Sequence, residues 1–375
     1  MEPDADPGLE LLSAPDVPDG AARTFDRILL GIARARTSIR VHMFVWRADA
    51  IGTSVANALL EAADRGVRVH IRKDLGALLY ERLEMNRKPL FPGRTGFGER
   101  ISLFLIGRTF PDTFVRDAYD AVPGERLLAH GQVTVEWVEH THTKYWVFDE
   151  SVLLLGSINL EDRHRGYHDY MVAIEGPGAI ERFEARREDR VPLDPARPVD
   201  FLVNDPGAEP PRREIRRALL DLLGEARESV YVEMAYLGDP EMTWALAAAA
   251  RRGVEVTVLL SRRANVGNDL NYHVGRQLFR EKGVTVLLSD TMLHSKMMFF
   301  DGKVAVLGSA NLSVFSMEKA GEIDVVVRDR PGFLAALERT ARSRRDAGVP
   351  VTALDQLSAY SRLLALGQQL HQRLG

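Results

Sequence analysis

The chain has 375 residues, of which 49 are Lys or Arg and 53 are Asp or Glu, so its formal net charge is −4. The share of hydrophobic residues, 45%, is typical of a globular protein and excludes wholesale disorder, and the length suffices for two to three domains. The absence of cysteine excludes disulfides, thiolate catalysis, zinc–cysteine sites and iron–sulfur clusters.

The first residues are acidic and rich in proline, and they lack the basic start and apolar run of a signal peptide. We expect residues 1–22 to form a flexible acidic leader. No apolar run approaches the length of a transmembrane helix, so we expect no transmembrane segment. The mildly acidic balance argues against a nucleic-acid partner, which usually requires a basic surface. These features together predict a cytoplasmic protein.

The remainder of the chain is a duplication. An amphipathic helix, an alternating strand, a second helix and a second strand follow one another over residues 24–74 and again over 213–261. The second helix of each copy stops at a glycine, Gly66 or Gly253, where a helix C-terminal cap is expected. Strands that alternate with helices in this order predict an α/β protein with helices packed on sheets.

Unequal copy lengths and composition suggest the domain boundaries. We assign residues 23–195 to an N-terminal domain and 213–330 to a C-terminal domain, joined by a proline-rich linker at 196–212. Residues 331–375 are expected to form a helical tail, which either packs on the protein or lies at a membrane surface. The first copy carries extra residues at about 76–130, which we interpret as a lid over the site rather than a decorative loop.

One motif occurs in both copies, at corresponding places: His-x-Lys, four residues, Asp, six residues, Gly-Ser-x-Asn. Residues i and i+2 of a strand face the same side, so each histidine shares a face with its lysine. Asp301 and Gly302 stand between apolar runs and predict a tight hairpin. The motif residues are His142, Lys144, Asp149, Gly156, Ser157 and Asn159 in the first copy and His294, Lys296, Asp301, Gly308, Ser309 and Asn311 in the second.

At a common site the two motifs would place two imidazoles, two ammonium groups and two carboxamides, with no carboxylate among the groups that would contact a ligand. This set is unsuited to a divalent metal, so we expect neither a metal nor another cofactor. It suits a phosphodiester, because ammonium groups and N–H donors stabilise charge on phosphoryl oxygens. One imidazole can attack phosphorus while the other protonates the leaving alcohol.

Two acidic residues occupy matched positions behind the motifs. Asp169 lies 27 residues after His142, and Glu322 lies 28 residues after His294. Each begins an apolar strand. A nucleophilic or acid–base histidine is usually oriented by a carboxylate on its second nitrogen. We therefore predict that Asp169 and Glu322 orient the histidines.

The paired motifs resemble those of the phospholipase D superfamily. Three stretches, 159–183, 248–260 and 292–312, are similar to bacterial cardiolipin synthases. The resemblance covers residues 24–330 and implies two tandem phospholipase D-like α-β-α sandwich domains, related by pseudo-two-fold symmetry with the active site at their interface. It also implies metal-independent phosphatidyl transfer through a phosphohistidine.

The resemblance assigns roles to the motif residues. His142 would be the nucleophile, and His294 would act first as general acid and then as base. Asp149 and Asp301 would brace the fold at the hairpins rather than take part in the chemistry. The phosphate would be held by Lys144, Lys296, Asn159 and Asn311, with support from Ser157 and Ser309.

The expected function is that of a cardiolipin synthase-like phosphatidyltransferase, with phosphatidylglycerol as donor and acceptor. The alternatives are a phospholipase D that releases phosphatidic acid, a nuclease of the same superfamily, and an inactive binding protein. The expected partners are a phospholipid substrate and the membrane surface, which the protein would contact peripherally from the cytoplasmic side. Because one chain carries both motifs, a monomer could form the complete site.

Overall fold

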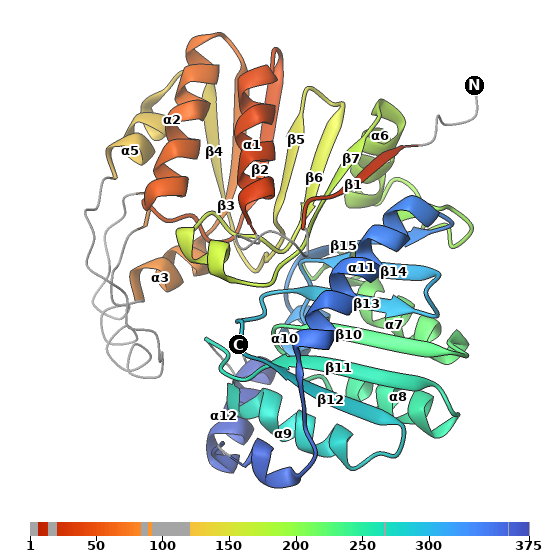
Figure 1. The fold of residues 1–375 in the computed structure, drawn as a ribbon. Helices are drawn as coiled ribbons and strands as arrows, with labels where there is room; N and C mark the ends of the chain where they lie inside the picture. Colours follow the sequence, from red (N-terminus) through yellow and green to blue (C-terminus); the bar gives the residue numbers. More distant parts are fainter. Residues whose placement is uncertain are drawn as a thin grey trace.

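The computed structural model describes residues 7–13, 21–83, 89–91, 121–265, 268–358 and 360–374. Two α/β halves lie one against the other (Figure 1). The elements of the first half are β1 (Gly8–Leu11), α1 (Ala22–Arg34), β2 (Ser38–Met43), α2 (Ala50–Asp64), β3 (Arg68–Asp74), α3 (Leu75–Leu83), α5 (Val122–Ala129), β4 (Val133–Val138), β5 (Tyr145–Phe148), β6 (Val152–Gly156), the short 3-10 helix η2 (Asp162–Gly166), β7 (Met171–Glu175) and α6 (Pro177–Arg187).

The second half repeats this succession and then adds a C-terminal segment. Its elements are β8 (Val199–Asp205), β9 (Arg212–Arg213), α7 (Glu214–Glu225), β10 (Ser229–Met234), α8 (Pro240–Arg251), β11 (Glu255–Ser261), α9 (Asn268–Phe279), β12 (Val284–Ser289), β13 (Lys296–Phe300), β14 (Val304–Gly308), α10 (Val314–Glu318), β15 (Glu322–Arg328), α11 (Pro331–Ala347), β16 (Val349–Pro350), η3 (Leu354–Leu357) and α12 (Arg362–Leu374).

The order of strands shows the duplication directly. Among the described residues, the first sheet has the order β1-β7-β6-β5-β2-β3-β4, and the second has the order β16-β12-β11-β10-β13-β14-β15-β8-β9. Six strands of one sheet therefore correspond to six of the other, with β5 equivalent to β13 and β7 to β15. In both sheets the central strands pair in parallel on one side and antiparallel on the other.

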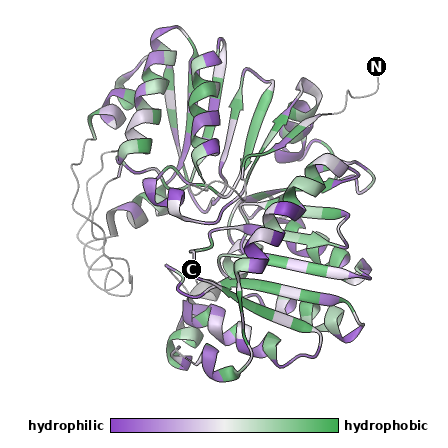
Figure 2. Cartoon of the chain, in the orientation of Figure 1, coloured by the Kyte–Doolittle hydropathy of each residue, from purple (hydrophilic) through white to green (hydrophobic). Residues whose placement is uncertain are grey.

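The described residues form three apolar cores, one in each half and one shared by both. Two lie on the outer faces of the sheets, under α1 and α2 in the first half and under α7 and α8 in the second. The third lies between the sheets and joins residues of both, among them Val147 and Met297. Helices α6 and α11 line this shared core, and they pack against β8 and β1, strands of the opposite sheets. The strands are therefore largely apolar, whereas the helices are apolar on one side only (Figure 2).

The predicted glycine caps are confirmed. Gly66 and Gly253 adopt φ values of 91° and 95°, a left-handed conformation that residues with a Cβ rarely adopt. Each glycine ends the second helix of its copy and redirects the chain into β3 or β11. The predicted hairpins are confirmed as well, since β5 pairs with β6 and β13 pairs with β14, both antiparallel.

Three segments differ from the boundaries expected from the sequence. Gly8–Leu11, assigned to the flexible leader, forms a strand that pairs with β7. Val199–Asp205, assigned to the linker, pairs with β15 and extends the second sheet. In both cases an exposed strand edge is covered, which satisfies backbone groups that would otherwise remain unpaired. The tail is only partly helical, because β16 pairs with β12 before α12 begins.

The lid hypothesis concerns residues that the structure covers only in part. Within 76–130, residues 84–88 and 92–120 lie outside the described residues, so the lid remains a prediction. Within the described residues, no helix is both long and apolar enough to cross a membrane.

Candidate active site

The two motifs lie on equivalent hairpins at the centres of the two sheets. The turns begin at Asp149 and Asp301, whose φ values are 48° and 51°. Neither carboxylate is directed to the site. Each accepts hydrogen bonds of 2.8–3.3 Å from three successive backbone N–H groups at the start of the neighbouring strand, and so fixes the hairpin to that strand. The donors are Arg36, Thr37 and Ser38 for Asp149 and Arg227, Glu228 and Ser229 for Asp301.

Just before each hairpin, the backbone at the histidine is bound to the other half. The N–H of His142 donates to the carbonyl of Gly321, and the N–H of His294 donates to the carbonyl of His168, both at 2.8 Å. Gly321 immediately precedes Glu322, the first residue of β15, and His168 immediately precedes Asp169, which lies two residues before β7. The backbone therefore brings each histidine beside the acidic residue of the opposite half.

The side chains complete this crossed arrangement. Nδ1 of His142 lies 3.1 Å from Oε1 of Glu322, and Nδ1 of His294 lies 2.9 Å from Oδ2 of Asp169. Both carboxylates are fully buried, whereas the imidazoles are 12% and 7% exposed. A hydrogen bond from Nδ1–H to a carboxylate leaves the lone pair on Nε2, which is the state a nucleophile or base requires. Each motif histidine is therefore paired with a carboxylate of the opposite half.

The two motif lysines are buried beside their histidines. Nζ of Lys296 donates to the carbonyl of His294 at 2.5 Å and lies 3.3 Å from its Nδ1. Nζ of Lys144 likewise donates to the carbonyl of His142. Burial lowers the pKa of Lys144 to about 7 and that of Lys296 to about 8. An anion bound between these lysines would stabilise their charged forms.

The same burial affects the histidines and their carboxylates. Burial and the charge of Lys144 lower the pKa of His142, while burial and the charge of Lys296 hold that of His294 well below its usual value. Burial alone would raise the pKa of Glu322, but its interaction with His142 holds it below the usual value. The site therefore contains ionised carboxylates behind histidines that lose their protons readily.

The motif asparagines each lie three residues after the second strand of the hairpin, β6 or β14. Asn159 and Asn311 are 3% and 5% exposed. Oδ1 of Asn159 accepts a hydrogen bond of 3.2 Å from the backbone N–H of Val45. Oδ1 of Asn311 has no hydrogen-bond partner among the described residues. The carboxamide of Asn311 therefore has hydrogen-bonding capacity that a ligand could use.

The motif serines have protein partners in the structure. Oγ of Ser157 donates to a carboxylate oxygen of Asp169. Oγ of Ser309 accepts from the N–H of Ile323 at 3.0 Å, and its hydrogen bond to Glu322 helps to lower the pKa of that carboxyl. The serines thus brace the carboxylates behind the histidines, and their support of a bound phosphate stays a prediction.

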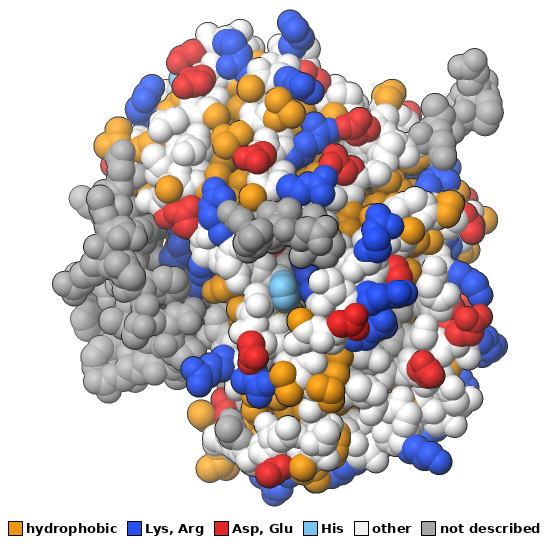
Figure 3. Space-filling view, in the orientation of Figure 1, with side chains coloured by type: hydrophobic (Ala, Val, Ile, Leu, Met, Phe, Trp, Pro, Cys, Tyr) orange, Lys and Arg blue, Asp and Glu red, His pale blue; other side chains and the backbone are white. Residues whose placement is uncertain are grey.

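An aromatic side chain lies against the first motif. The ring of Phe44 packs edge-to-face on His142 with 4.6 Å between centroids, and Nζ of Lys144 lies 5.1 Å from the centre of the Phe44 ring. Apolar contact of this kind excludes water from one side of the imidazole. In the space-filling view, a histidine side chain is visible in a hollow at the junction of the halves (Figure 3).

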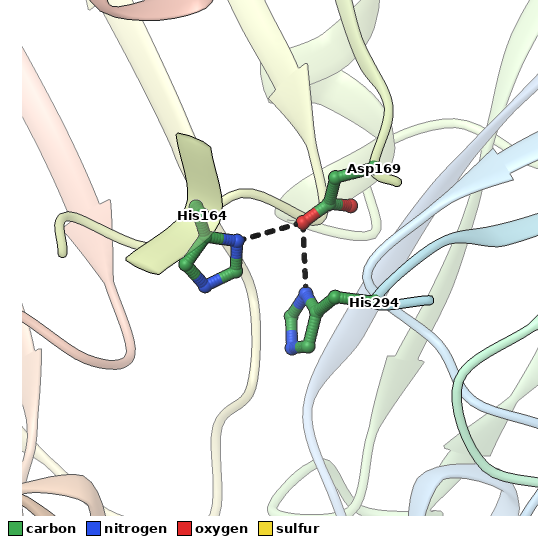
Figure 4. Close-up of side chains that lie close together, drawn as sticks. All are labelled: His164, Asp169 and His294. Carbon is green, nitrogen blue, oxygen red and sulfur yellow. Dashed lines mark hydrogen bonds and ion pairs between the residues drawn. The ribbon is translucent and has the colours of Figure 1, made fainter. Parts of the chain in front are cut away.

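Sequence reasoning missed two residues of the site, His164 and Glu161. Nδ1 of His164 lies 2.9 Å from Oδ2 of Asp169 (Figure 4), and its Nε2 lies 3.1 Å from Oε1 of Glu161. Comparison of the copies offered a signal, because Ser316 occupies the corresponding place in the second motif.

His164, Asp169 and His294 also place three potential metal-binding atoms within 4.8 Å of one another. The ammonium of Lys296 lies 3.3 Å from Nδ1 of His294, and its charge disfavours a second cation there. Nδ1 of His164 and Nδ1 of His294 already lie at hydrogen-bonding distance from Asp169. The donor set therefore fits a hydrogen-bonded acid–base cluster better than a metal centre.

The comparison with protein families identifies the fold and its relatives. The family model described as "Cardiolipin synthase, PLD-like domain" matches residues 28–189 and 219–344. The chain belongs to this family. Its two matched segments coincide with the two α/β halves, and each contains one motif.

Several relatives and one solved structure extend this result. Cardiolipin synthase B of Salmonella typhimurium is 25% identical over 341 residues, which cover 82% of this chain and 74% of the relative. Cardiolipin synthase A of Erwinia tasmaniensis is 25% identical over 373 residues, which cover 90% and 70%. The phosphatidylserine synthase structure of Haemophilus influenzae superposes with a TM-score of 0.67 at 12% identity, over 98% of this chain and 93% of that chain. The structural likeness confirms that this family member has the two-domain phospholipase D-like fold.

Proposed function

We propose that the protein is a cardiolipin synthase-like phosphatidyltransferase that uses phosphatidylglycerol as donor and acceptor and forms a phosphohistidine intermediate. Membership in the cardiolipin synthase family supports phospholipid phosphatidyl transfer as the reaction class. The observation that carries the proposal is the crossed pair of histidine–carboxylate contacts, His142 with Glu322 and His294 with Asp169. Two imidazoles with opposite duties suit a reaction in which a phosphodiester is first broken and then remade.

The first half-reaction transfers the phosphatidyl group to the protein. Nε2 of His142 attacks phosphorus, a nitrogen–phosphorus bond forms, and the bond to the leaving glycerol oxygen breaks. His294 gives its Nε2 proton to that oxygen. Glu322 holds the proton of His142 on Nδ1, so that the lone pair of Nε2 is directed at phosphorus.

The second half-reaction reverses the roles of acid and base. His294, now neutral, takes the proton of the acceptor hydroxyl, and the acceptor oxygen attacks the phosphohistidine. The bond between Nε2 of His142 and phosphorus breaks, which restores the imidazole. Lys144 and Lys296 supply positive charge to the phosphoryl oxygens in both steps, and burial strengthens this effect by excluding water.

We further propose that the protein acts at the cytoplasmic face of a membrane as a peripheral enzyme. Helix α12 packs on α9 and buries Ala365, while Leu363, Leu364 and Leu366 remain 82%, 55% and 56% exposed. Exposed leucines on a terminal helix suit contact with the apolar boundary of a lipid surface.

The test is to incubate the purified protein with phosphatidylglycerol vesicles, with and without ethanol, and to analyse the lipids by mass spectrometry. Cardiolipin, and phosphatidylethanol when ethanol is present, would support the proposal. The His142→Asn variant should form neither product. Phosphatidic acid as the sole product would identify a hydrolase, and cleavage of single-stranded DNA without lipid turnover would identify a nuclease. Either result would contradict the proposal.

A further inference from the structure

A buried histidine outside the two motifs lies at the centre of the first half of the site. His164 belongs to η2, is fully buried, and contacts a carboxylate with each ring nitrogen. Figure 4 shows the contact with Asp169. Nδ1 lies 2.9 Å from Oδ2 of Asp169, and Nε2 lies 3.1 Å from Oε1 of Glu161. An imidazole that contacts two carboxylates donates to both only when it carries both protons.

One oxygen of Asp169 therefore contacts two histidines. Its Oδ2 lies 2.9 Å from Nδ1 of His294 and 2.9 Å from Nδ1 of His164. The two rings are nearly perpendicular, at 89°, and their centroids are 4.6 Å apart. The other carboxylate oxygen of Asp169 accepts from Ser157 and from the backbone N–H of Tyr170.

The second half of the site lacks this arrangement. Ser316 stands at the place of His164, seven residues after the motif serine in each copy. Its hydroxyl accepts a hydrogen bond of 3.2 Å from the backbone N–H of Asn311. Within the described chain, Glu322 contacts one imidazole, that of His142. The two catalytic histidines thus occupy equivalent positions, but the carboxylate beside His142 contacts one imidazole and the carboxylate beside His294 contacts two.

The charges around His164 maintain its protonated form. Oε2 of Glu161 lies 2.7 Å from Nε of Arg47 and 2.8 Å from Nε of Arg163, so Glu161 remains ionised. Burial alone would lower the pKa of His164, but its hydrogen bonds to Asp169 and Glu161 raise it above the usual value. The ring of Tyr167 packs on the ring of His164. These contacts favour the protonated form of His164, whose ring lies against the ring of His294.

We propose that His164 is a positioning residue that shares Asp169 with His294. The shared contact makes His294 a weaker base than it would be if Asp169 contacted His294 alone. This role rests on the proposed function only for its purpose, which is to let the general acid release its proton to the leaving oxygen. The charged groups that face His294 are Asp169, His164 and Lys296. Of these, His164 alone has no counterpart in the second motif.

The test measures the protonation of His294 directly, by NMR titration of protein with isotope-labelled histidine and without substrate. The His294→Asn variant assigns the signal. The variant His164→Ser copies the second half of the site and removes the neighbouring positive charge. The titration midpoint of His294 should rise by about one pH unit, because a like charge at this distance disfavours protonation.

A second variant separates charge from folding. His164→Gln keeps an amide that can donate to a carboxylate but carries no charge, and it should produce a shift in the same direction. The control is His168→Asn, which alters a neighbouring histidine whose ring has no hydrogen bond to Asp169 in the described structure. An unchanged midpoint in both His164 variants, or an equal shift in the control, would overturn the proposal. Because no substrate is present, failure of the phosphatidyl-transfer assay would leave this result intact.

Discussion

Nδ1 of His142 lies 3.1 Å from Oε1 of Glu322, although 180 residues separate them in the chain. The contact joins the first half of the molecule to the second. Its counterpart joins His294 of the second half to Asp169 of the first, at 2.9 Å. Each motif histidine therefore receives its carboxylate from the other half, and this pair of contacts forms only when both halves are folded and docked.

The first prediction concerns the orienting carboxylate. Glu322→Gln should reduce kcat by about 10²- to 10⁴-fold, because an amide supports the required tautomer of His142 less well than a carboxylate does. The melting temperature should stay close to that of the wild type. Glu318→Gln, a partly exposed site on the adjacent helix, is the control and should retain activity. Wild-type kcat in Glu322→Gln would show that Glu322 does not orient the nucleophile.

The second prediction concerns a buried ion pair that holds the C-terminal segment to the site. Nη1 of Arg344 donates to Oε1 of Glu233 at 2.5 Å, and Nη2 donates to the carbonyl of Asp169 at 3.0 Å. Arg344→Met should lower the free energy of unfolding by about 3–5 kcal/mol, because the buried carboxylate of Glu233 would lose its positively charged partner. Chemical denaturation measures this change.

A matched control lies on the same helix. Arg342 is 62% exposed and lies 3.1 Å from Glu338, so Arg342→Met should cost less than about 1 kcal/mol. The double variant Glu233→Gln with Arg344→Met should recover part of the loss. Equal costs for the two single arginine variants would show that the buried pair does not stabilise the protein.

The third prediction concerns the pH dependence of stability. Burial raises the pKa of Asp324 from 3.8 to about 7. The folded protein therefore holds a proton that the unfolded chain releases. The contribution of Asp324 to the free energy of unfolding falls as pH rises from about 4 to 7. Asp324→Asn removes the cost of ionising this buried carboxyl. Between pH 4 and pH 8, the free energy of unfolding of the variant should therefore rise relative to that of the wild type by roughly 2–4 kcal/mol.

Urea unfolding at several pH values tests this prediction. The exposed substitution Asp346→Asn serves as the control, and its stability relative to the wild type should not vary with pH. A constant difference between Asp324→Asn and the wild type across this range would mean that Asp324 ionises normally in the folded protein.

The fourth prediction concerns metals. The motifs supply ammonium groups beside the histidines, and such a site needs no divalent cation to balance the phosphate charge. Treatment with EDTA followed by gel filtration should leave the rate of phosphatidyl transfer unchanged. Loss of activity that returns on adding a divalent cation would contradict this expectation.

Much of this site could be predicted because its local geometry follows from spacing. A two-residue separation places His142 and Lys144 on one face, and an acid seven residues after the histidine lies at the far end of the strand, where Asp149 braces the hairpin. The candidate orienting acids could be found by comparing the copies. Which acid serves which histidine could not, because that depends on how the halves dock.

Other features depended on tertiary contacts that leave little trace in a single sequence. The strand Val199–Asp205 lies among prolines, which favoured its interpretation as a linker, yet it covers an edge of the second sheet. The hydrogen bonds of Ser157 to Asp169 and of Ser309 to Glu322 could not be foreseen from spacing, and phosphate binding by these serines stays a prediction. His164 differs from its counterpart Ser316, and its role becomes visible only when Asp169 is placed between two imidazoles.

The most direct test of the central claim is to trap and map the covalent intermediate. Protein mixed with radiolabelled phosphatidylglycerol should be quenched, digested under alkaline conditions that preserve phosphohistidine, and sequenced by mass spectrometry. Label on His142, absent in His142→Asn and accumulating in His294→Asn, is the predicted result. Label on His294, or undiminished turnover in either variant, would contradict the assignment of nucleophile and general acid.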